Sequence, residues 1–253
     1  MKKCVYCKRD KNVKMSREHV ISSAVLRSAF GKENRNVTRY NGKKFFDHEH
    51  VIKDVCSDCN SILSPYDAIG KEFIELITPH YKSSYVKFPC DLHFINWLIK
   101  THLNQLRIIK DVENSKYYNI TSEIYKRIIN FEYPSKSLLK LYVSGWLGKK
   151  YYWDENSPRK TSYFSYRSVR FRNQNIIVSN FRVKFFDTFI FLPYLNNYSN
   201  FDSRVRNAIQ EMKQDFNFNL QEIDLDNSKG KCIDIKEKVT HKELELIKYK
   251  LDD

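Results

Sequence analysis

The sequence has no stretch that would anchor the chain in a membrane. Its most apolar run, residues 185–195, is too short to cross a bilayer and contains Asp187 and Pro193. The first residues are Met1 and two lysines, but no apolar segment of a signal peptide follows them. Internal repeats and long low-complexity tracts are also missing. We therefore expect a cytoplasmic protein that does not bind a membrane.

Negative charge is scarce relative to positive charge. The 253 residues include 30 Asp and Glu against 44 Lys and Arg, which gives a net charge of +14. This excess predicts an acidic partner, with nucleic acid ahead of an anionic membrane surface. The alternative is a lysine-rich composition without such a partner. Hydrophobic residues at 42% and aromatic residues at 15% provide a core and argue against disorder.

Four of the six cysteines form two Cys-x-x-Cys pairs, Cys4 with Cys7 and Cys56 with Cys59. Each pair can chelate from one tight turn, and two such turns complete a tetrahedral zinc site. The chain shows no export signal, so a structural zinc is a better interpretation than disulfides. Chance cysteines or a redox pair are the alternatives. The remaining two, Cys90 and Cys232, are expected to be reduced thiols.

Glu18 and His19 lie between the two cysteine pairs, and Asn60 follows the second pair directly. Closing the zinc site would bring the three together. A neutral imidazole can accept a proton from water near neutral pH, and carboxylate and amide oxygens suit a magnesium ion. Asp67, two helical turns after Asn60, is a further candidate ligand or supporting acid. The alternatives are an exposed acid at Glu18 and a packed imidazole at His19.

The combined pattern over residues 4–67 resembles the HNH endonuclease family, which has the ββα-metal fold. The pattern is Cys-x-x-Cys, then Glu-His-Val-Ile, then Cys-x-x-Cys-Asn-x-x-Leu. The resemblance implies that Glu18 and Asn60 ligate a catalytic Mg²⁺ or Mn²⁺ and that His19 is the general base. It implies hydrolysis of phosphodiester bonds in DNA. Small stand-alone members often serve in restriction, phage defence or mobile elements, so a role in phage defence or restriction is expected.

One position departs from the family pattern. The family has a middle asparagine that orients the base, and this sequence has Val51 there, beside His50. His50 is the first candidate to replace it. Asn34, Asn36 or a backbone carbonyl are the others. The departure keeps two alternatives open, a ribonuclease of the HNH type and a non-catalytic, zinc-stabilised nucleic-acid-binding protein.

The hydrophobic pattern predicts an α+β protein with a boundary near residue 78. Residues 1–78 form the expected ββα-metal HNH module, and residues 79–253 a mixed helical and antiparallel-sheet region that binds nucleic acid or a partner. Helices are predicted at 22–30, 60–76, 91–110, 121–131, 135–146, 202–216 and 240–251. Strands are predicted at 161–172, 176–186 and 188–192, with an edge strand at 218–225.

Basic and aromatic residues alternate in the predicted sheet. The basic ones that we expect to contact nucleic acid are Arg167, Arg170, Arg172, Arg182 and Lys184. A solvated cationic sheet face is the alternative interpretation. DNA is the first expected partner and RNA the second. A homodimer or a partner protein of a defence system is compatible with the sequence.

Overall fold

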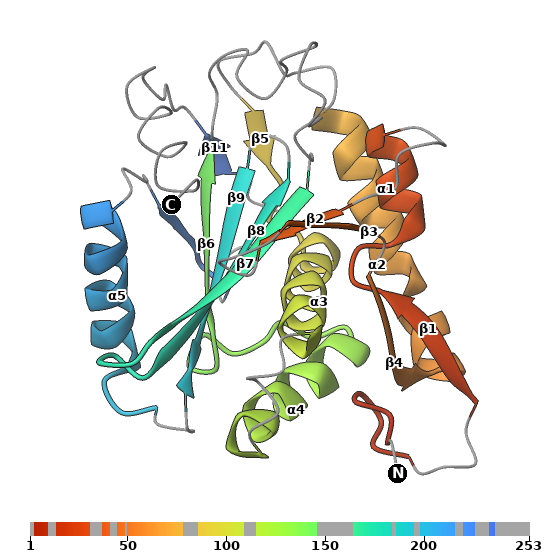
Figure 1. Ribbon diagram of the computed structural model, residues 1–253, viewed down its shortest axis with the longest axis horizontal. Coiled ribbons are helices and arrows are strands. Elements are labelled where there is room, and N and C mark those ends of the chain that lie inside the picture. The colour runs from red at the N-terminus through yellow and green to blue at the C-terminus, as the bar shows by residue number, and fades with distance from the viewer. Residues whose placement is uncertain are drawn as a thin grey trace.

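The protein combines helices with mostly antiparallel strands, so the predicted α+β class is confirmed (Figure 1). The computed structural model describes residues 3–9, 14–30, 37–40, 45–48, 50–77, 86–108, 115–145, 164–183, 186–194, 198–215, 220–225 and 233–235. Its elements are β1 (Met15–His19), α1 (Ser23–Phe30), β2 (Val37–Tyr40), β3 (Phe45–His48), β4 (Val51–Cys56), α2 (Ser57–Ile77), β5 (Val86–Phe88), α3 (Leu92–Ile108), α4 (Ser115–Ile129), β6 (Lys140–Gly145), β7 (Phe164–Phe171), β8 (Ile176–Val183), β9 (Phe186–Pro193), α5 (Phe201–Asp215), β10 (Gln221–Ile223) and β11 (Ile233–Ile235).

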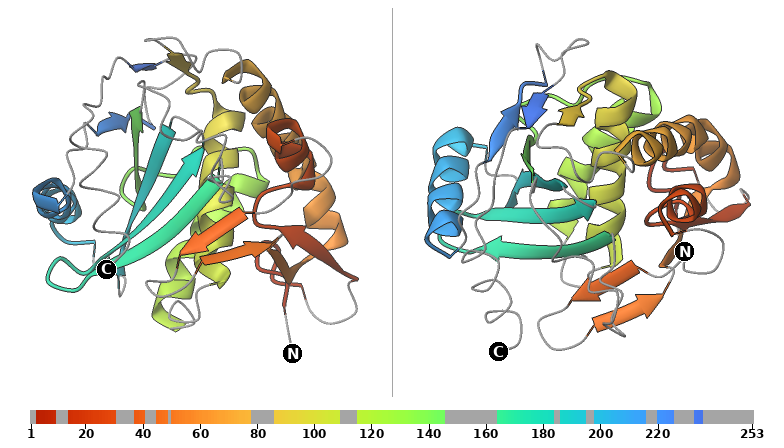
Figure 2. Two further views of the ribbon diagram at one scale, coloured as in Figure 1. Left: turned by 45° about the horizontal axis from the view of Figure 1, so that its top comes forward. Right: turned by 90° about the horizontal axis from the view of Figure 1, so that it is seen from above.

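A seven-stranded sheet in the order β10-β6-β9-β8-β7-β2-β3 forms the centre of the protein. Its pairs are antiparallel except β2 with β7, where Thr38 lies opposite Ser165. Side chains along β8 alternate between the two faces, as a strand requires. Ile177 and Phe181 belong to the core under α3, whereas Ile176 and Val178 belong to the core under α5. The sheet therefore separates two hydrophobic layers (Figure 2).

The helix α3 is buried along most of its length between the sheet and α2. The approach of α2 depends on Gly70, because a Cβ atom there would overlap the indole ring of Trp97. Phe73 of α2 stacks within the same aromatic core, 4.6 Å from Phe94 between ring centroids. Because α3 is buried on all sides from Phe94 to Leu106, each polar side chain in that stretch needs an internal partner.

A strand pair followed by a helix surrounds the cysteines. β1 pairs antiparallel with β4, with Met15 opposite Cys56 and His19 opposite Val51. α2 begins at Ser57, directly after β4, and packs against both strands. The elements α1, β2 and β3 are inserted between β1 and β4. The register places the start of β1 beside the end of β4 and the start of α2, and the end of β1 beside the start of β4 (Figure 1).

Most predicted elements are confirmed, with shifted ends. α2 begins before its predicted start and passes through Pro65, and α4 begins earlier than predicted. The helix predicted at residues 135–146 is wrong over β6, which instead pairs with β9 and β10. The short apolar run of β6 is compatible with a helix or a strand by its local pattern. Hydrogen bonding to a neighbouring strand on each side stabilises the strand. The helix predicted at 240–251 lies outside the described residues.

The predicted division at residue 78 stays a prediction. β2 and β3 precede this residue and belong to the same sheet as β6 to β10. One hydrophobic core also contains residues from both parts, including Tyr66, Trp97 and Phe181. The two parts thus share a sheet and a core. None of the helices in the described ranges is both long and apolar enough to cross a membrane.

Candidate functional site

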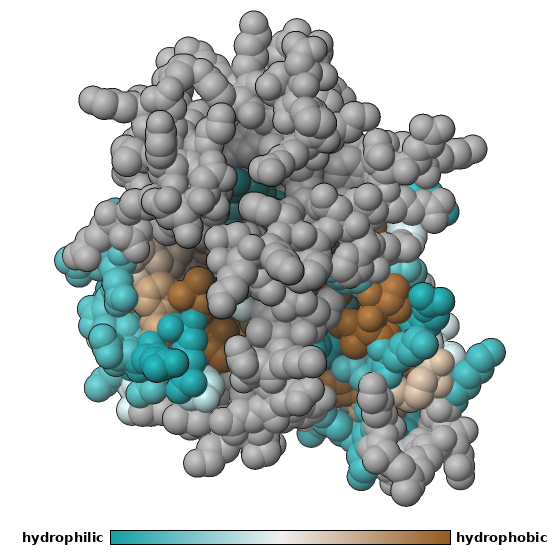
Figure 3. Space-filling view, in the orientation of Figure 1, coloured by the Kyte–Doolittle hydropathy of each residue, from teal (hydrophilic) through white to brown (hydrophobic). Residues whose placement is uncertain are grey.

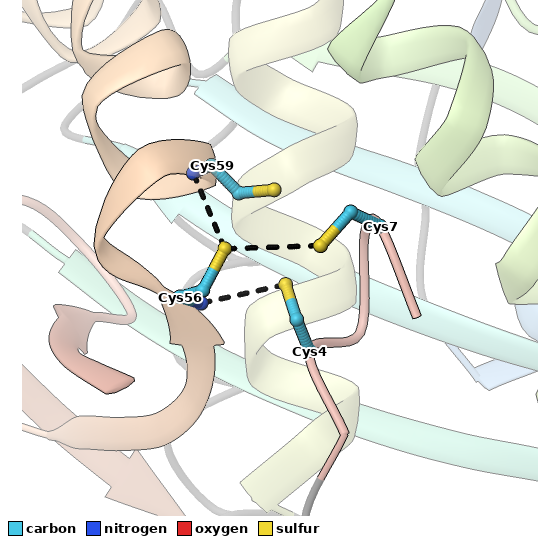
Figure 4. A group of neighbouring side chains, drawn as sticks. All are labelled: Cys4, Cys7, Cys56 and Cys59. Atoms are coloured by element: carbon cyan, nitrogen blue, oxygen red, sulfur yellow. Dashed lines mark hydrogen bonds between the residues drawn. The ribbon is translucent and has the colours of Figure 1, made fainter. Parts of the chain in front are cut away.

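The four cysteines of the two Cys-x-x-Cys pairs converge on one point (Figure 4). Cys4 and Cys7 lie on an N-terminal turn, Cys56 ends β4, and Cys59 is in the first turn of α2. Their four Sγ atoms lie within 4.8 Å of one another, and Cys7 and Cys56 are 3.8 Å apart. Zn–S bonds of about 2.3 Å put the sulfurs of a tetrahedral site about 3.8 Å apart. The cluster could therefore bind a metal such as zinc.

Backbone amides support this sulfur cluster. The Cys56 amide donates to the Cys4 sulfur at 3.4 Å, and the Cys59 amide donates to the Cys56 sulfur at 3.5 Å. The Val5 amide donates to the Asp54 carbonyl at 2.9 Å, which fastens the N-terminal turn to β4. Donors aimed at sulfur stabilise thiolates, the form that ligates a metal.

The thiols differ in acidity. Burial alone would raise the pKa of Cys7, but hydrogen bonds from the backbone and side chain of Arg9 bring this pKa down to about 7. Burial raises the pKa of Cys56 and of Cys59. A bound cation is therefore needed to hold all four sulfurs as thiolates at neutral pH.

His19 is the last residue of β1, and its side chain is partly exposed. Its Nε2 atom lies 3.4 Å from the hydroxyl oxygen of Ser23 at the start of α1. His50 is nearly buried, and its carbonyl accepts a hydrogen bond from the Val20 amide at 2.9 Å. His50 is thus joined to the residue after His19 through the backbone. Its proposed role in orienting the base stays a prediction.

The side chain of Glu18 points away from solvent and into the core beside α3. Its side chain is 2% exposed. Asn104 Nδ2 donates to Oε1 at 3.1 Å, and Lys100 Nζ lies 3.3 Å from the same oxygen. Arg107 Nη2 donates to Oε2 at 2.9 Å. Both carboxylate oxygens are therefore occupied by groups from one helix. Asn104 also donates to the carbonyl of His19 at 3.3 Å, so α3 holds the end of β1.

Asp67 and Asn60 lie on α2. Asn60 is in the first turn and is partly exposed. Asp67 accepts a hydrogen bond from Lys100 Nζ at 2.8 Å. The structure thus brings the predicted ligands Glu18 and Asp67 to one place, with the ammonium group of Lys100 in contact with both.

Arg107 completes this buried group, which we call the Glu18 cluster: Glu18, Asp54, Asp67, Lys100, Asn104 and Arg107. Arg107 Nε lies 3.5 Å from Oδ2 of Asp54. The guanidinium carbon is 5.9 Å from the ring centroid of Tyr6 and 5.4 Å from that of Tyr125. The cluster therefore links the cysteine turn, β4, α3 and α4, as well as β1 and α2.

The ionisation of the Glu18 cluster follows from its ion pairs. Burial would raise the pKa of Glu18, but the charges of Lys100 and Arg107 hold it below its ordinary value. Burial would lower the pKa of Lys100, but Asp67 and Glu18 raise it above its ordinary value. Glu18 and Lys100 are therefore both charged at neutral pH.

A catalytic divalent metal does not fit between Glu18 and Asp67. An ion there would share the carboxylates with Lys100 and would lie beside Arg107, so three positive groups would meet in a buried space. Within the described part of the chain, the four cysteines are the one group of three or more Cys, His, Asp or Glu side chains placed to share an ion.

The sequence contained a signal for the Glu18 cluster. Lys100, Asn104 and Arg107 recur at helical spacing in α3, and so lie on one face of this helix. A buried lysine and a buried arginine require carboxylate partners. The spacing does not say which carboxylates they are, because Glu18 lies 86 residues from Asn104 and 89 residues from Arg107.

Two of the predicted nucleic-acid-binding residues, Arg170 and Arg172, are exposed. They line a groove of about 500 Å³ between β7 and α5, with an apolar floor that includes Val178 and Phe189. The guanidinium carbon of Arg170 lies 3.6 Å from the ring centroid of Tyr194. Figure 3 shows apolar surface next to the hydrophilic residues on the α5 side of the molecule.

The other predicted basic residues are placed differently. Arg182 forms a bidentate ion pair with the buried Asp187, with contacts of 3.0 Å and 2.8 Å. Arg167 lies in β7 opposite Asn180. Lys184 lies outside the described residues. Arg182 is thus engaged within the sheet, and the predicted set does not form one described surface.

Comparison of the chain with protein-family models, with curated proteins and with solved structures finds no match.

Proposed function

We propose that this chain is a zinc-stabilised endonuclease that hydrolyses phosphodiester bonds in DNA, with His19 as the general base. The observation that carries the proposal is the arrangement around the cysteine cluster. β1 and β4 pair, α2 follows β4 directly, His19 ends β1, and Asn60 lies in the first turn of α2. This is the order of elements and residues that the resemblance to HNH endonucleases implies.

Zinc in the cysteine cluster would serve the fold. The turn of Cys4 and Cys7, the end of β4 and the start of α2 meet at the cysteine cluster. Two further contacts join them, the backbone hydrogen bond between Val5 and Asp54 and the ion pair between Arg9 and Asp58. A structural zinc ion would fix the start of α2 against β4 and so set the place of Asn60 relative to β1. Zinc is thus assigned a structural role, separate from the chemistry at His19.

His19 has the properties that a general base needs. Its imidazole is partly exposed, so a water and a phosphate can approach it. The carbonyl of His19 is held by Asn104, and Nε2 lies near the hydroxyl of Ser23, so the ring is attached to a fixed backbone. A positioned imidazole accelerates proton abstraction from water by roughly 10²- to 10⁴-fold.

The charge of the chain supports a nucleic-acid substrate. The net charge is +14, and two arginines are exposed, Arg170 in β7 and Arg172 in the turn that follows it. Basic side chains that replace counterions on phosphates supply most of the non-specific affinity for DNA. An exposed arginine stacked on an aromatic ring, as Arg170 is on Tyr194, leaves a flat cationic surface for a phosphate or base.

The test compares zinc-loaded wild type, His19→Ala and His93→Ala on supercoiled plasmid with no added metal, with Mg²⁺ and with Mn²⁺. His93 is an exposed histidine of α3 and serves as the control. We expect the wild type and the control to cut, and His19→Ala to cut roughly 10²- to 10⁴-fold more slowly with unchanged DNA affinity. If His19→Ala cuts at the wild-type rate, His19 is not the general base.

A second candidate, a zinc-stabilised nucleic-acid-binding protein without catalysis, is favoured by one observation. Glu18, the expected metal ligand, is engaged by Lys100 and Arg107. A wild type that binds DNA or RNA but cuts neither with any of the metals above would establish this alternative. Cleavage of RNA alone would instead identify a ribonuclease.

A further inference from the structure

We propose that Lys100 is a built-in cation that replaces a divalent metal between Glu18 and Asp67. Its Nζ atom lies 2.8 Å from Oδ1 of Asp67 and 3.3 Å from Oε1 of Glu18. An ion that bridges two carboxylates would occupy this same position. The proposal concerns what the carboxylate pair binds, and it holds whether or not the chain cuts nucleic acid.

Lys100 cannot leave this position easily. Its side chain is 3% exposed, and α3 is buried on both sides of it, with Trp97 and Thr101 among the buried residues. The ammonium group therefore cannot reach solvent unless the side chains around it move. A charged ammonium group withdrawn from both carboxylates would be buried without a partner, which is strongly unfavourable.

The other contacts of Glu18 also exclude a second cation. Arg107 binds Oε2 at 2.9 Å, and Asn104 directs an N–H group at Oε1 at 3.1 Å. Lys100 and Asn104 together occupy Oε1 and Arg107 faces Oε2, so a metal finds no open lone pair in the wild type, whereas removal of the ammonium group opens one at Oε1. In addition, Lys100 and Arg107 already face the three carboxylates of the Glu18 cluster, so a divalent ion would leave the cluster with a net positive charge.

This assignment gives Glu18 a positioning role. The carboxylate fastens β1 to α3, and Asn104 contacts both Glu18 and the carbonyl of His19. The end of β1 is therefore fixed by ion pairs within the chain. Divalent cations should consequently have no effect on the structure around Glu18, although they can act elsewhere on the protein.

The experiment measures Mn²⁺ binding to zinc-loaded protein by electron paramagnetic resonance up to about 1 mM, the range of weak protein sites. We expect Asp67 to bind no Mn²⁺ in the wild type. Wild type and Asp67→Asn should therefore give the same Mn²⁺ titration curve. Lys100→Met removes the charge with little change of shape. It should gain one Mn²⁺ site, at least about tenfold tighter than any wild-type binding, and Lys100→Met/Glu18→Gln should lose it.

Lys71→Met is the matched control, because Lys71 is exposed and pairs with Glu75 on α2. It should gain no Mn²⁺ site. Wild-type binding of one Mn²⁺ that Asp67→Asn abolishes would overturn the proposal, as would a folded Lys100→Met protein that gains no site. If Lys100→Met does not fold, the thermal midpoint of zinc-loaded wild type decides. It should not rise with Mn²⁺, and a rise that is absent in Asp67→Asn would contradict the proposal.

Discussion

The cysteine cluster and the Glu18 cluster are two groups of buried polar side chains on neighbouring elements. They differ in what provides the positive charge that each group needs. The four thiols of the cysteine cluster converge on a common centre. The carboxylates of the Glu18 cluster converge on Lys100 and Arg107. The first arrangement is completed by an ion from solution, and the second by side chains of the chain itself.

The difference follows from when each group is charged. Burial raises the pKa of Cys56 and Cys59, so these thiols are neutral until a metal binds and the cysteine cluster can fold around an incoming ion. A carboxylate is charged at neutral pH from the start, and burying it without a partner is costly. Glu18 therefore needs permanent positive charge, which Lys100 and Arg107 supply. A pair of carboxylates in a sequence does not by itself distinguish a metal site from an internal ion pair.

The largest effect should come from breaking the cysteine cluster. Cys56→Ser removes one of four ligands, and structural zinc contributes on the order of 10 kcal/mol to folding. We expect loss of bound zinc and insoluble or protease-sensitive protein. Cys90→Ser is the control, because Cys90 is buried but lies outside the cluster. It should retain about one zinc per chain by metal analysis, and a folded zinc-free wild type would contradict the zinc assignment.

Breaking the Glu18 cluster should have the next largest effect. Glu18→Ala leaves Lys100 and Arg107 buried with too few carboxylates, which typically costs about 3–5 kcal/mol. Urea unfolding of the zinc-loaded protein should show this loss without any added divalent metal. Glu75→Ala, at an exposed glutamate, should leave the urea midpoint nearly unchanged, because exposed ion pairs contribute little. Equal stability of the two variants would mean that the ion pairs of Glu18 contribute little.

The two clusters also differ in how far the sequence predicts them. The cysteine cluster is predictable because x2 spacing is a local constraint, and two such pairs complete one tetrahedron. Glu18 was assigned to a metal because its sequence neighbours, His19 and the cysteines, suggested one. Its actual partners are on α3, more than 80 residues away. No local pattern identifies a contact at that separation.

The fold shows the same limit. α3, α5 and the β7–β8 hairpin have strong periodicity or turn signals and were predicted correctly. β6 was predicted as a helix, because its short apolar run fits both structures. Its pairing with β9 and β10 decides the outcome, and that pairing depends on distant parts of the chain.

A third buried polar group surrounds His102 and differs from both clusters, because no ion pair holds it. His102 contacts Ser179 and Thr188, both at 3.0 Å, and neither partner carries a charge. Burial lowers the pKa of His102 to about 3. The unfolded chain, with an ordinary histidine pKa of about 6.5, then binds more protons than the folded chain between these values. The stabilisation that depends on neutral His102 should be fully present above about pH 6.5. As the pH falls from there towards 3, the free energy of unfolding should decrease by about 1.4 kcal/mol per pH unit.

His102→Gln removes this titration, and His93→Gln is the matched control because His93 is exposed on the same helix. The loss of stability between about pH 6 and pH 4 should be shallower in His102→Gln than in wild type or in His93→Gln. Urea unfolding at a series of pH values measures it. Identical slopes in all three proteins would show that His102 does not cause acid sensitivity.

The smallest effect concerns the exposed arginines. If Arg170 and Arg172 contact phosphates, replacing both with alanine should reduce the slope of log affinity against log salt by about 2 for double-stranded DNA. Arg206, exposed on α5, provides the control, and Arg206→Ala should leave the slope unchanged. Fluorescence anisotropy at several salt concentrations measures the slope. An unchanged slope in the double variant would show that these arginines do not contact phosphates and belong to a solvated face.

Anomalous diffraction from zinc-loaded crystals soaked in Mn²⁺ would test the contrast between the two clusters most directly. We expect a zinc peak among the sulfurs of Cys4, Cys7, Cys56 and Cys59, at about 2.3 Å from each. Between Glu18 and Asp67 we expect density for the Lys100 ammonium group and no manganese peak. A manganese peak at that position, with Lys100 displaced, would show that the carboxylates form a metal site.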